Sequence, residues 1–251
     1  MVSALSSPAP VFGLRDVTLA VDGQELLSSL SFTLAPRQKH VLMGPNGAGK
    51  SLTLRLLQGL LAPSRGTVLG LGPDGQAARS SRVVGLNRAM VLQRPVLLRR
   101  SVAANLRHAF KVYGMARQEW PAALDHWLEV AGLADKAQLS ARLLSGGEQQ
   151  RLSVVRALAA KPDLLLLDEP AAHLDPAATG QIEALIEAAH RAGVTVLLVT
   201  HDLGQARRVA DHILFLSHGA LAEQTPAAQF FAQPASLAAQ RYLAGSLVDW
   251  K

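Results

Sequence analysis

The chain has 251 residues, of which 49% are hydrophobic, and this is enough apolar material to bury a substantial core. It contains no cysteine, which excludes disulfides, thiolate catalysis and zinc sites built on cysteine. The formal net charge is +6, and the excess comes from the segment between Arg79 and Arg117, where nine basic residues occur without one acidic residue.

The apolar runs are too short to cross a bilayer, which needs about 18 to 20 residues. The first ten residues lack the basic and apolar regions of a secretory signal, so we expect a cytosolic protein. The basic segment fits a surface that meets anionic lipid headgroups, nucleic acid or an acidic partner. The alternative is a solvated helical face.

Short branched or leucine-rich runs alternate with helical stretches, a pattern typical of a mostly parallel α/β sheet. The predicted strands cover residues 11–17, 31–34, 40–43, 89–92, 164–167, 194–199 and 213–216. The predicted helices cover residues 52–61, 101–113, 117–131 and the stretch between Asp175 and Gly193. Asp175 can cap this last helix, Pro176 suits its first turn and Gly193 can end it. Residues 94–144 hold helices and no strong strand, which predicts a helical subdomain inserted into the sheet domain.

A phosphate-binding loop follows the third predicted strand. The pattern G-x-x-x-x-G-K-[ST] is matched between a strand and a helix by Gly44, Pro45, Asn46, Gly47, Ala48, Gly49, Lys50 and Ser51. Glycines let backbone N–H groups turn toward phosphates, and the following helix adds the positive end of its dipole. Lys50 can reach the terminal phosphates of a nucleotide, and the Ser51 hydroxyl can bind Mg²⁺. A glycine-rich structural turn is the weaker alternative.

Two neighbouring carboxylates end the predicted strand at 164–167. Asp168 and Glu169 stand at the carboxyl end of an apolar run, where open α/β sheets hold ligands. Asp168 suits a ligand of Mg²⁺, while Glu169 can accept a proton from, or orient, the water that attacks a terminal phosphate. Alone, such a pair is more often a solvated strand end. Beside a phosphate loop it indicates nucleotide hydrolysis.

A third motif resembles a known family. Residues 144–151 read LSGGEQQR, which resembles the signature sequence of ABC ATPases. Taken alone, the motif marks a helix N-terminus capped by Ser145, with Glu148 completing a capping box. A helix N-terminus that carries two glycines, Gly146 and Gly147, is also an anion site. In the family this signature closes over the terminal phosphate held by the opposite subunit, so the resemblance implies a homodimer with ATP between its subunits.

The resemblance runs from about residue 11 to residue 220 and implies three further roles. Gln93 stands where the family's Q-loop glutamine contacts Mg²⁺ or the attacking water and reports the nucleotide state to the membrane partner. Asp175 lies in a segment that resembles the D-loop, which crosses the dimer interface. His201 resembles the switch histidine, which binds the terminal phosphate and positions Glu169. The implied catalytic group is therefore Glu169, His201 and Gln93.

The resemblance also implies the cofactor and the fold. Mg²⁺ would be bound by Ser51, Asp168 and Gln93, with ATP as the substrate. The implied fold is an α/β P-loop NTPase of the ABC type, with a mainly parallel sheet core, N-terminal antiparallel strands and an inserted helical subdomain. Residues 1–251 would form a single ATPase domain, and residues 94–144 its helical subdomain.

Two positions depart from the family pattern. Many members carry an aromatic side chain near Val21, which stacks on adenine, so base binding in this chain would be weaker or built differently. Leu52 replaces the hydroxyl residue that usually follows Ser51. One hydroxyl contact to the phosphates is lost there, but the backbone N–H of Leu52 remains in the nucleotide-binding set.

These motifs predict the ATP-hydrolysing subunit of a membrane transporter. The expected partners are a second copy of the chain, an integral membrane permease and, indirectly, an extracytoplasmic solute-binding protein, with no nucleic acid. The expected location is the cytoplasmic face of the inner (plasma) membrane, as a peripheral subunit. Residues 94–100 mix apolar and basic side chains directly after Gln93, which predicts the contact with the permease.

The predicted cargo is an oxyanion such as tungstate, because residues 44–54 and 91–106 resemble the tungstate importer branch, often grouped with phosphate and molybdate importers. The alternative function is a non-transport ABC ATPase that acts on ribosomes or nucleic acid, although such relatives usually carry two cassettes or a long coiled-coil insertion. A kinase or GTPase with the same phosphate loop is disfavoured by the signature at residues 145–151.

Overall fold

The computed structural model describes residues 12–70 and 87–245, and its core is a six-stranded sheet in the order β5-β6-β7-β3-β8-β9. The strands are β3 (Lys39–Met43), β5 (Arg88–Val91), β6 (Leu164–Asp168), β7 (Thr195–Val199), β8 (His212–Ser217) and β9 (Ala220–Pro226). All neighbouring strands are parallel except β8 and β9. The predicted α/β class with a mainly parallel core is confirmed.

A second sheet has three antiparallel strands in the order β2-β1-β4, namely β1 (Phe12–Val21), β2 (Gln24–Leu34) and β4 (Arg65–Leu69). The expected N-terminal antiparallel strands are therefore present and longer than predicted. The sequence pattern does not predict the edge strands β4 and β9. Both are short of branched apolar residues, and β9 buries the polar side chains of Glu223 and Thr225 instead. Residue 11 of the first predicted strand lies outside the described residues.

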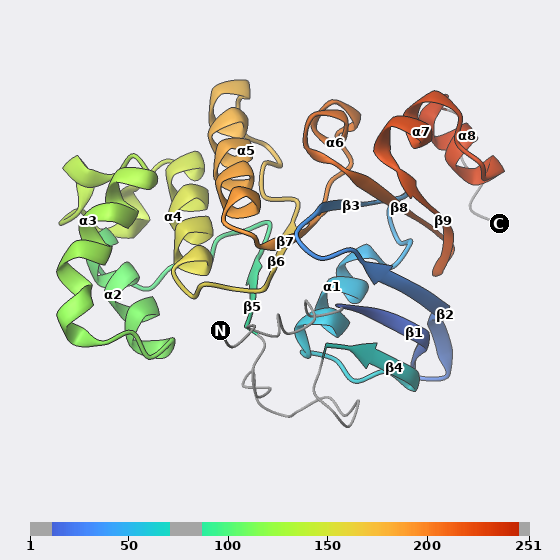
Figure 1. Ribbon diagram of the computed structural model, residues 1–251, viewed down its shortest axis with the longest axis horizontal. Helices are drawn as coiled ribbons and strands as arrows, with labels where there is room; N and C mark the ends of the chain where they lie inside the picture. Colours follow the sequence, from blue (N-terminus) through green and yellow to red (C-terminus); the bar gives the residue numbers. More distant parts are fainter. Residues whose placement is uncertain (1–11, 71–86, 246–251) are drawn as a thin grey trace, which may run out of the picture.

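Eight α-helices surround the sheets in the described part of the chain. They are α1 (Lys50–Gln58), α2 (Val102–Val112), α3 (Trp120–Val130), α4 (Gly146–Leu158), α5 (Pro176–Arg191), α6 (Leu203–Val209), α7 (Ala227–Ala232) and α8 (Leu237–Leu243). Figure 1 shows α2, α3 and α4 gathered at one end of the molecule. Within residues 12–70 and 87–245, no helix is long and apolar enough to cross a membrane.

The predicted helix boundaries hold best where capping residues mark them. The Asp175 side chain accepts a hydrogen bond from the backbone N–H of Ala178 at 2.8 Å, and Pro176 begins α5 as expected. The prediction of one helix at 117–131 is wrong in detail, because residues Arg117–Glu119 form a 3₁₀ turn before α3 begins. Proline in the first turn of α3 suits a helix start but not a helix interior.

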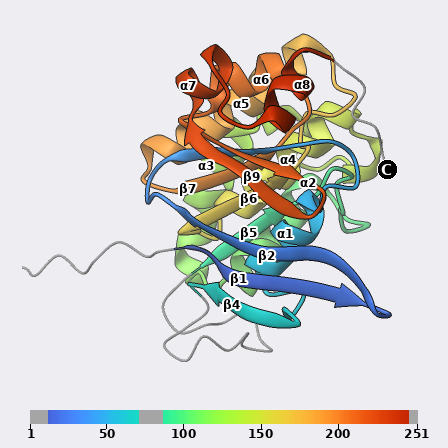
Figure 2. The same ribbon diagram turned by 90° about the vertical axis from the view of Figure 1, so that its right-hand side faces the viewer.

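Side chains on the two faces of β6 enter two different cores. Leu165 and Leu167 join the larger core, together with buried residues of α4 and α5. Leu164 and Leu166 join a second core beneath α1 and the three-stranded sheet. In Figure 2 the three-stranded sheet lies at the bottom and helices α5 to α8 at the top, with the six-stranded sheet between them. Because successive side chains of a strand point to opposite faces, β6 is buried on both faces up to Asp168, where it ends.

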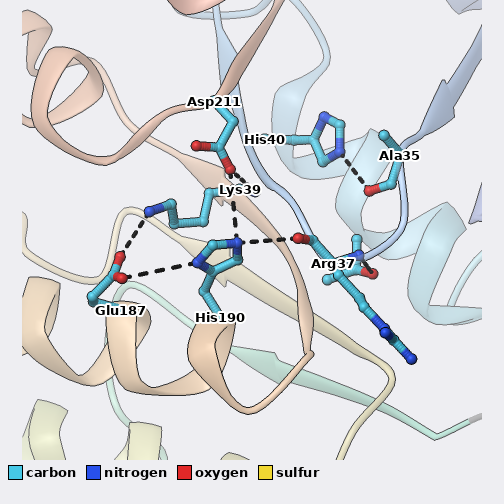
Figure 3. Close-up of polar contacts among 8 residues, drawn as sticks. Ala35, Arg37, Lys39, His40, Glu187, His190 and Asp211 are labelled. Carbon is cyan, nitrogen blue, oxygen red and sulfur yellow. Dashed lines mark hydrogen bonds and ion pairs between the residues drawn. The ribbon is translucent and has the colours of Figure 1, made fainter.

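A polar cluster fixes the amino end of β3, the strand that leads into the phosphate loop (Figure 3). The Lys39 ammonium contacts the Glu187 carboxylate at 2.7 Å, and the Lys39 backbone N–H donates to Asp211 Oδ2 at 2.8 Å. His190 Nε2 lies 3.0 Å from the carbonyl oxygen of Arg37. These contacts join β3 to α5 and to the turn that precedes β8.

Replacing Asp211 with Ala is expected to lower the free energy of unfolding by about 1 kcal/mol, because a backbone N–H at the start of β3 loses its acceptor. Urea denaturation measures this change. Asp211→Asn is the matched control, since its amide oxygen can still accept that hydrogen bond. Equal destabilisation by both variants would show that the hydrogen bond contributes nothing.

Candidate functional site

Residues 44–51 form a tight loop between β3 and α1. Two of its glycines are required by their surroundings as well as by backbone conformation. A Cβ at Gly44 (φ 143°) would lie 2.1 Å from the carbonyl oxygen of Leu216, and one at Gly49 (φ 97°) would lie 2.2 Å from a methyl carbon of Leu27. The loop is therefore pressed against β8 on one side and β2 on the other, which fixes the direction of its backbone.

Lys50 places a buried ammonium group at the start of α1. Its Nζ donates to the carbonyl oxygens of Gly44 at 2.7 Å and Pro45 at 2.9 Å, so the side chain folds back over the loop. Burial lowers the pKa of Lys50, while the carboxylates of Glu169 and Asp168 act in the opposite direction. Phosphate oxygens are stronger acceptors for this cation than neutral carbonyls are. Lys50 is therefore placed to exchange carbonyl contacts for phosphate contacts.

Ser51 and Asp168 bring a hydroxyl and a carboxylate together. Ser51 Oγ donates to Asp168 Oδ1 at 3.3 Å. Burial raises the pKa of Asp168, the Ser51 hydrogen bond lowers it, and the neighbouring Glu169 charge raises it further. Oxygen donors of this kind suit Mg²⁺, which commonly takes one or two protein ligands and completes its shell with phosphate and water. In the described residues no group of three or more His, Asp or Glu side chains could hold a metal ion.

At Glu169, directly after the end of β6, the backbone turns away from the direction of the strand. Its φ is 46°, a left-handed value that costs a non-glycine residue about 1 kcal/mol, and its N–H donates to the carbonyl oxygen of Val199 at 3.0 Å. The turn separates the two carboxylates, so Asp168 faces Ser51 and Glu169 does not. Strained residues of this kind cluster at functional sites.

Glu169 meets the two other residues expected in the catalytic group. Its Oε2 atom lies 3.1 Å from His201 Nδ1 and 3.5 Å from Gln93 Nε2. Gln93 follows β5 and His201 follows β7, the two strands that flank β6 in the sheet. Because these strands are parallel, their carboxyl ends deliver all three side chains to one edge.

A cavity of about 590 Å³ lies where these elements meet. Its lining consists of Gly44, Pro45, Asn46, Gln93, Glu169, His201 and Tyr242. All but the last belong to motifs that the sequence predicts. Tyr242 lies in α8 and was missed, because no motif includes it and only the packing of α8 brings it to the cavity.

The signature residues do not line this cavity. Ser145 caps α4 by accepting a hydrogen bond from the Glu148 backbone N–H at 3.4 Å, and Glu148 accepts one from the Ser145 N–H at 2.8 Å, which confirms the capping box. Hydrogen bonds from Lys136 and then from the Ser145 N–H lower the pKa of Glu148 to about 2. Its carboxylate therefore stays ionised at neutral pH. Figure 1 shows α4, which begins with Gly146 and Gly147, well separated from α1.

The remaining predicted positions occupy three different settings. The Asp175 carboxylate accepts the hydrogen bond that caps α5. Leu52 is half-buried and packs against the core beneath the three-stranded sheet, so its side chain serves the fold. Val21 is 48% exposed at the end of β1 and presents an apolar surface without a ring.

Comparisons with known proteins find relatives along most of the chain. The protein-family model described as "ABC transporter" matches residues 27–172. The chain is 36% identical over 250 residues to the phosphate import ATP-binding protein PstB 2 of Natronomonas pharaonis, covering 92% of this chain and 86% of that protein. It is 34% identical over 242 residues to the methionine import ATP-binding protein MetN of Brucella abortus, covering 95% of this chain and 66% of that protein.

Two solved structures share the fold. The ATP binding subunit of an ABC transporter superposes with a TM-score of 0.77 at 26% identity, covering 94% of this chain and 98% of that one. A bacterial Atm1-family ABC exporter with ATP bound superposes with a TM-score of 0.80 at 27% identity, covering 98% of this chain and 44% of that one.

Proposed function

The chain belongs to the ABC transporter family, and from this premise we propose that it hydrolyses ATP to drive solute import through a separate membrane permease. The observation that carries the proposal is the convergence of the phosphate loop with Glu169, His201 and Gln93 around one cavity. Import is favoured over export because the two sequence relatives, at 36% and 34% identity, are import ATP-binding proteins, whereas the exporter structure shares 27% identity with this chain.

Each side chain of the site has a role in phosphoryl transfer. Lys50 would exchange its loop carbonyls for the terminal phosphates of ATP, and Ser51 and Asp168 would hold Mg²⁺. When bound, the ion neutralises charge on the phosphates. Glu169 orients the attacking water, and His201 and Gln93 hold the Glu169 carboxylate in place. The reaction requires positioning and charge neutralisation more than covalent catalysis.

A second copy of the chain completes each ATP site in this proposal. The N-terminus of α4 offers the Ser145 hydroxyl and two glycine N–H groups to an anion, yet none of these residues lines the cavity of its own chain. Two chains arranged head to tail would bring each signature to the phosphates held by the other. Asp175, which caps α5, would lie in the segment that crosses between the copies.

The permease contact is proposed on a surface that starts directly after Gln93. Val96, Val112 and Tyr113 are 69%, 50% and 49% exposed there, and they line a groove of about 260 Å³. Exposed apolar side chains gathered around a groove mark an interaction site. Arg94, Arg99 and Arg100 add positive charge to the same segment. Arg79 and Arg82 of the basic segment lie outside the described residues.

Replacing both Arg99 and Arg100 with Glu is expected to weaken association with the permease severalfold, because charge reversal opposes an anionic or acidic neighbour. The measurement is recovery of the tagged chain with solubilised membranes. The control reverses Arg15 and Arg65, which are exposed on the three-stranded sheet. Unchanged recovery and unchanged permease-coupled ATPase in the Arg99 and Arg100 variant would contradict the assignment of this surface.

Purification of the wild-type chain from its own cells tests the proposed function as a whole. An integral membrane subunit should accompany the chain, which would then lie on the cytoplasmic face of the inner membrane as a peripheral subunit. Recovery with ribosomes or DNA instead would support the alternative of a non-transport ATPase, which none of the relatives described above favours.

The proposed cargo is an oxyanion such as tungstate. Two segments, 44–54 and 91–106, resemble the tungstate importer branch, and the relative PstB 2 is an import protein for phosphate, another tetrahedral oxyanion. The chain also matches a methionine import protein over 95% of its length, so the proposal rests on the two segments and not on overall similarity. Calorimetry on the extracytoplasmic binding protein that works with this chain would decide. Binding of methionine, with no binding of tungstate, molybdate or phosphate, would refute the oxyanion proposal.

A further inference from the structure

One wall of the catalytic cavity belongs to a residue outside every motif, Tyr242 in α8. Its ring is half-buried, with its centroid 5.2 Å from that of Phe215 in β8. The next residue of β8, Leu216, is the one whose carbonyl oxygen packs against Gly44. The tyrosine ring is thus anchored on the same strand that supports the start of the phosphate loop.

The hydroxyl of Tyr242 is available to a ligand. Within residues 12–70 and 87–245 it forms no hydrogen bond with another side chain or with the backbone. A half-buried tyrosine hydroxyl at the wall of a cavity can hydrogen-bond to a ligand held there. Burial, and to a smaller extent the Glu169 carboxylate, raise the pKa of Tyr242, so the phenol stays protonated at neutral pH and can donate.

The other residues that line the cavity limit which group can accept a hydrogen bond from the Tyr242 hydroxyl. Glu169 already contacts His201 and Gln93, and the remaining lining comes from residues 44–46 of the phosphate loop. We propose that the Tyr242 hydroxyl donates a hydrogen bond to the terminal phosphate of ATP in this cavity. Helix α8 thereby becomes part of the nucleotide site. The inference rests on the proposed function, because it requires ATP at the phosphate loop.

Tyr242→Phe removes one oxygen atom and keeps the ring against Phe215. In a chain that also carries Glu169→Gln, to prevent turnover, this change should weaken ATP binding about tenfold, as expected for losing a hydrogen bond to a charged group. ADP binding should not change, since ADP lacks the terminal phosphate. Calorimetric titration with each nucleotide in the presence of Mg²⁺ measures both affinities.

The ratio of the ATP and ADP affinities separates a phosphate contact from a packing role. Arg241→Gln, an exposed change on the same helix, is the matched control and should leave both affinities unaltered. An unchanged ratio in Tyr242→Phe, or equal weakening of both nucleotides, would overturn the inference. If the chain with Tyr242 intact fails to bind ATP, the proposed function itself is wrong. If the chain with Tyr242 intact binds ATP normally and Tyr242→Phe leaves the ratio of ATP to ADP affinity unchanged, only the proposed role of Tyr242 is wrong.

Discussion

Replacing Glu169 with Gln is expected to lower ATP turnover by about a hundredfold while ATP still binds, because a positioned general base contributes about that factor or more. The amide keeps the size of the side chain and can still contact His201 and Gln93, but it cannot accept a proton. In the unchanged chain, the carboxylate oxygen Oε2 of Glu169 lies 3.1 Å from His201 Nδ1. Phosphate release measures turnover, and calorimetry measures ATP affinity.

The control for this experiment is Glu129→Gln, an exposed carboxylate on α3 that should turn over ATP at the wild-type rate. A Glu169→Gln chain with near-normal turnover would remove Glu169 from the catalytic group. A chain that loses ATP binding as well would show that Glu169 is needed to form the site rather than to run the reaction.

Replacing Ser145 with Asp is expected to abolish most turnover through the second copy of the chain. Asp caps a helix as well as Ser does, so α4 should remain intact. Its negative charge would face the phosphates held by the opposite subunit and repel them. ATP affinity of the single chain should stay the same, because Ser145 does not line the cavity of its own chain.

The matched control is Ser101→Asp, the same exchange at the N-cap of α2, which should keep full turnover. Turnover and nucleotide affinity are measured as for Glu169→Gln. If Ser145→Asp hydrolyses ATP at the wild-type rate, the signature takes no part in the site. If it weakens ATP binding to the isolated chain, the signature acts within one subunit.

The convergence of Gln93, Glu169 and His201 was predictable because each follows an apolar run that the sequence marks as a strand. Parallel neighbours place their carboxyl ends at one edge of the sheet. Glu169 therefore meets both Gln93, 76 positions earlier, and His201, 32 positions later. The capping box of α4 and the N-cap of α5 were predictable for a similar reason, since side chain and backbone lie within one turn.

Tyr242 and the edge strands show what local patterns leave out. Tyr242 reaches the cavity only because α8 packs its ring on Phe215, a contact set by tertiary structure. Glu223 is buried in β9, where its carboxylate accepts hydrogen bonds from the backbone N–H groups of residues 235 and 236. Because a polar residue occupies this buried position, the sequence pattern does not indicate a strand. The position of Glu169 was predicted, but its left-handed backbone was not, because nothing in Asp-Glu-Pro requires it.

The molar mass of the Glu169→Gln chain in Mg²⁺ and ATP tests whether two subunits share each ATP site. We expect the mass to double from the 26.6 kDa of one chain when ATP is added, because each ATP joins the phosphate loop of one copy to the signature of the other. Adding Ser145→Asp to the same chain should leave ATP bound and the mass at 26.6 kDa. A Glu169→Gln chain that binds ATP fully and remains a single chain would contradict an ATP site shared between two subunits.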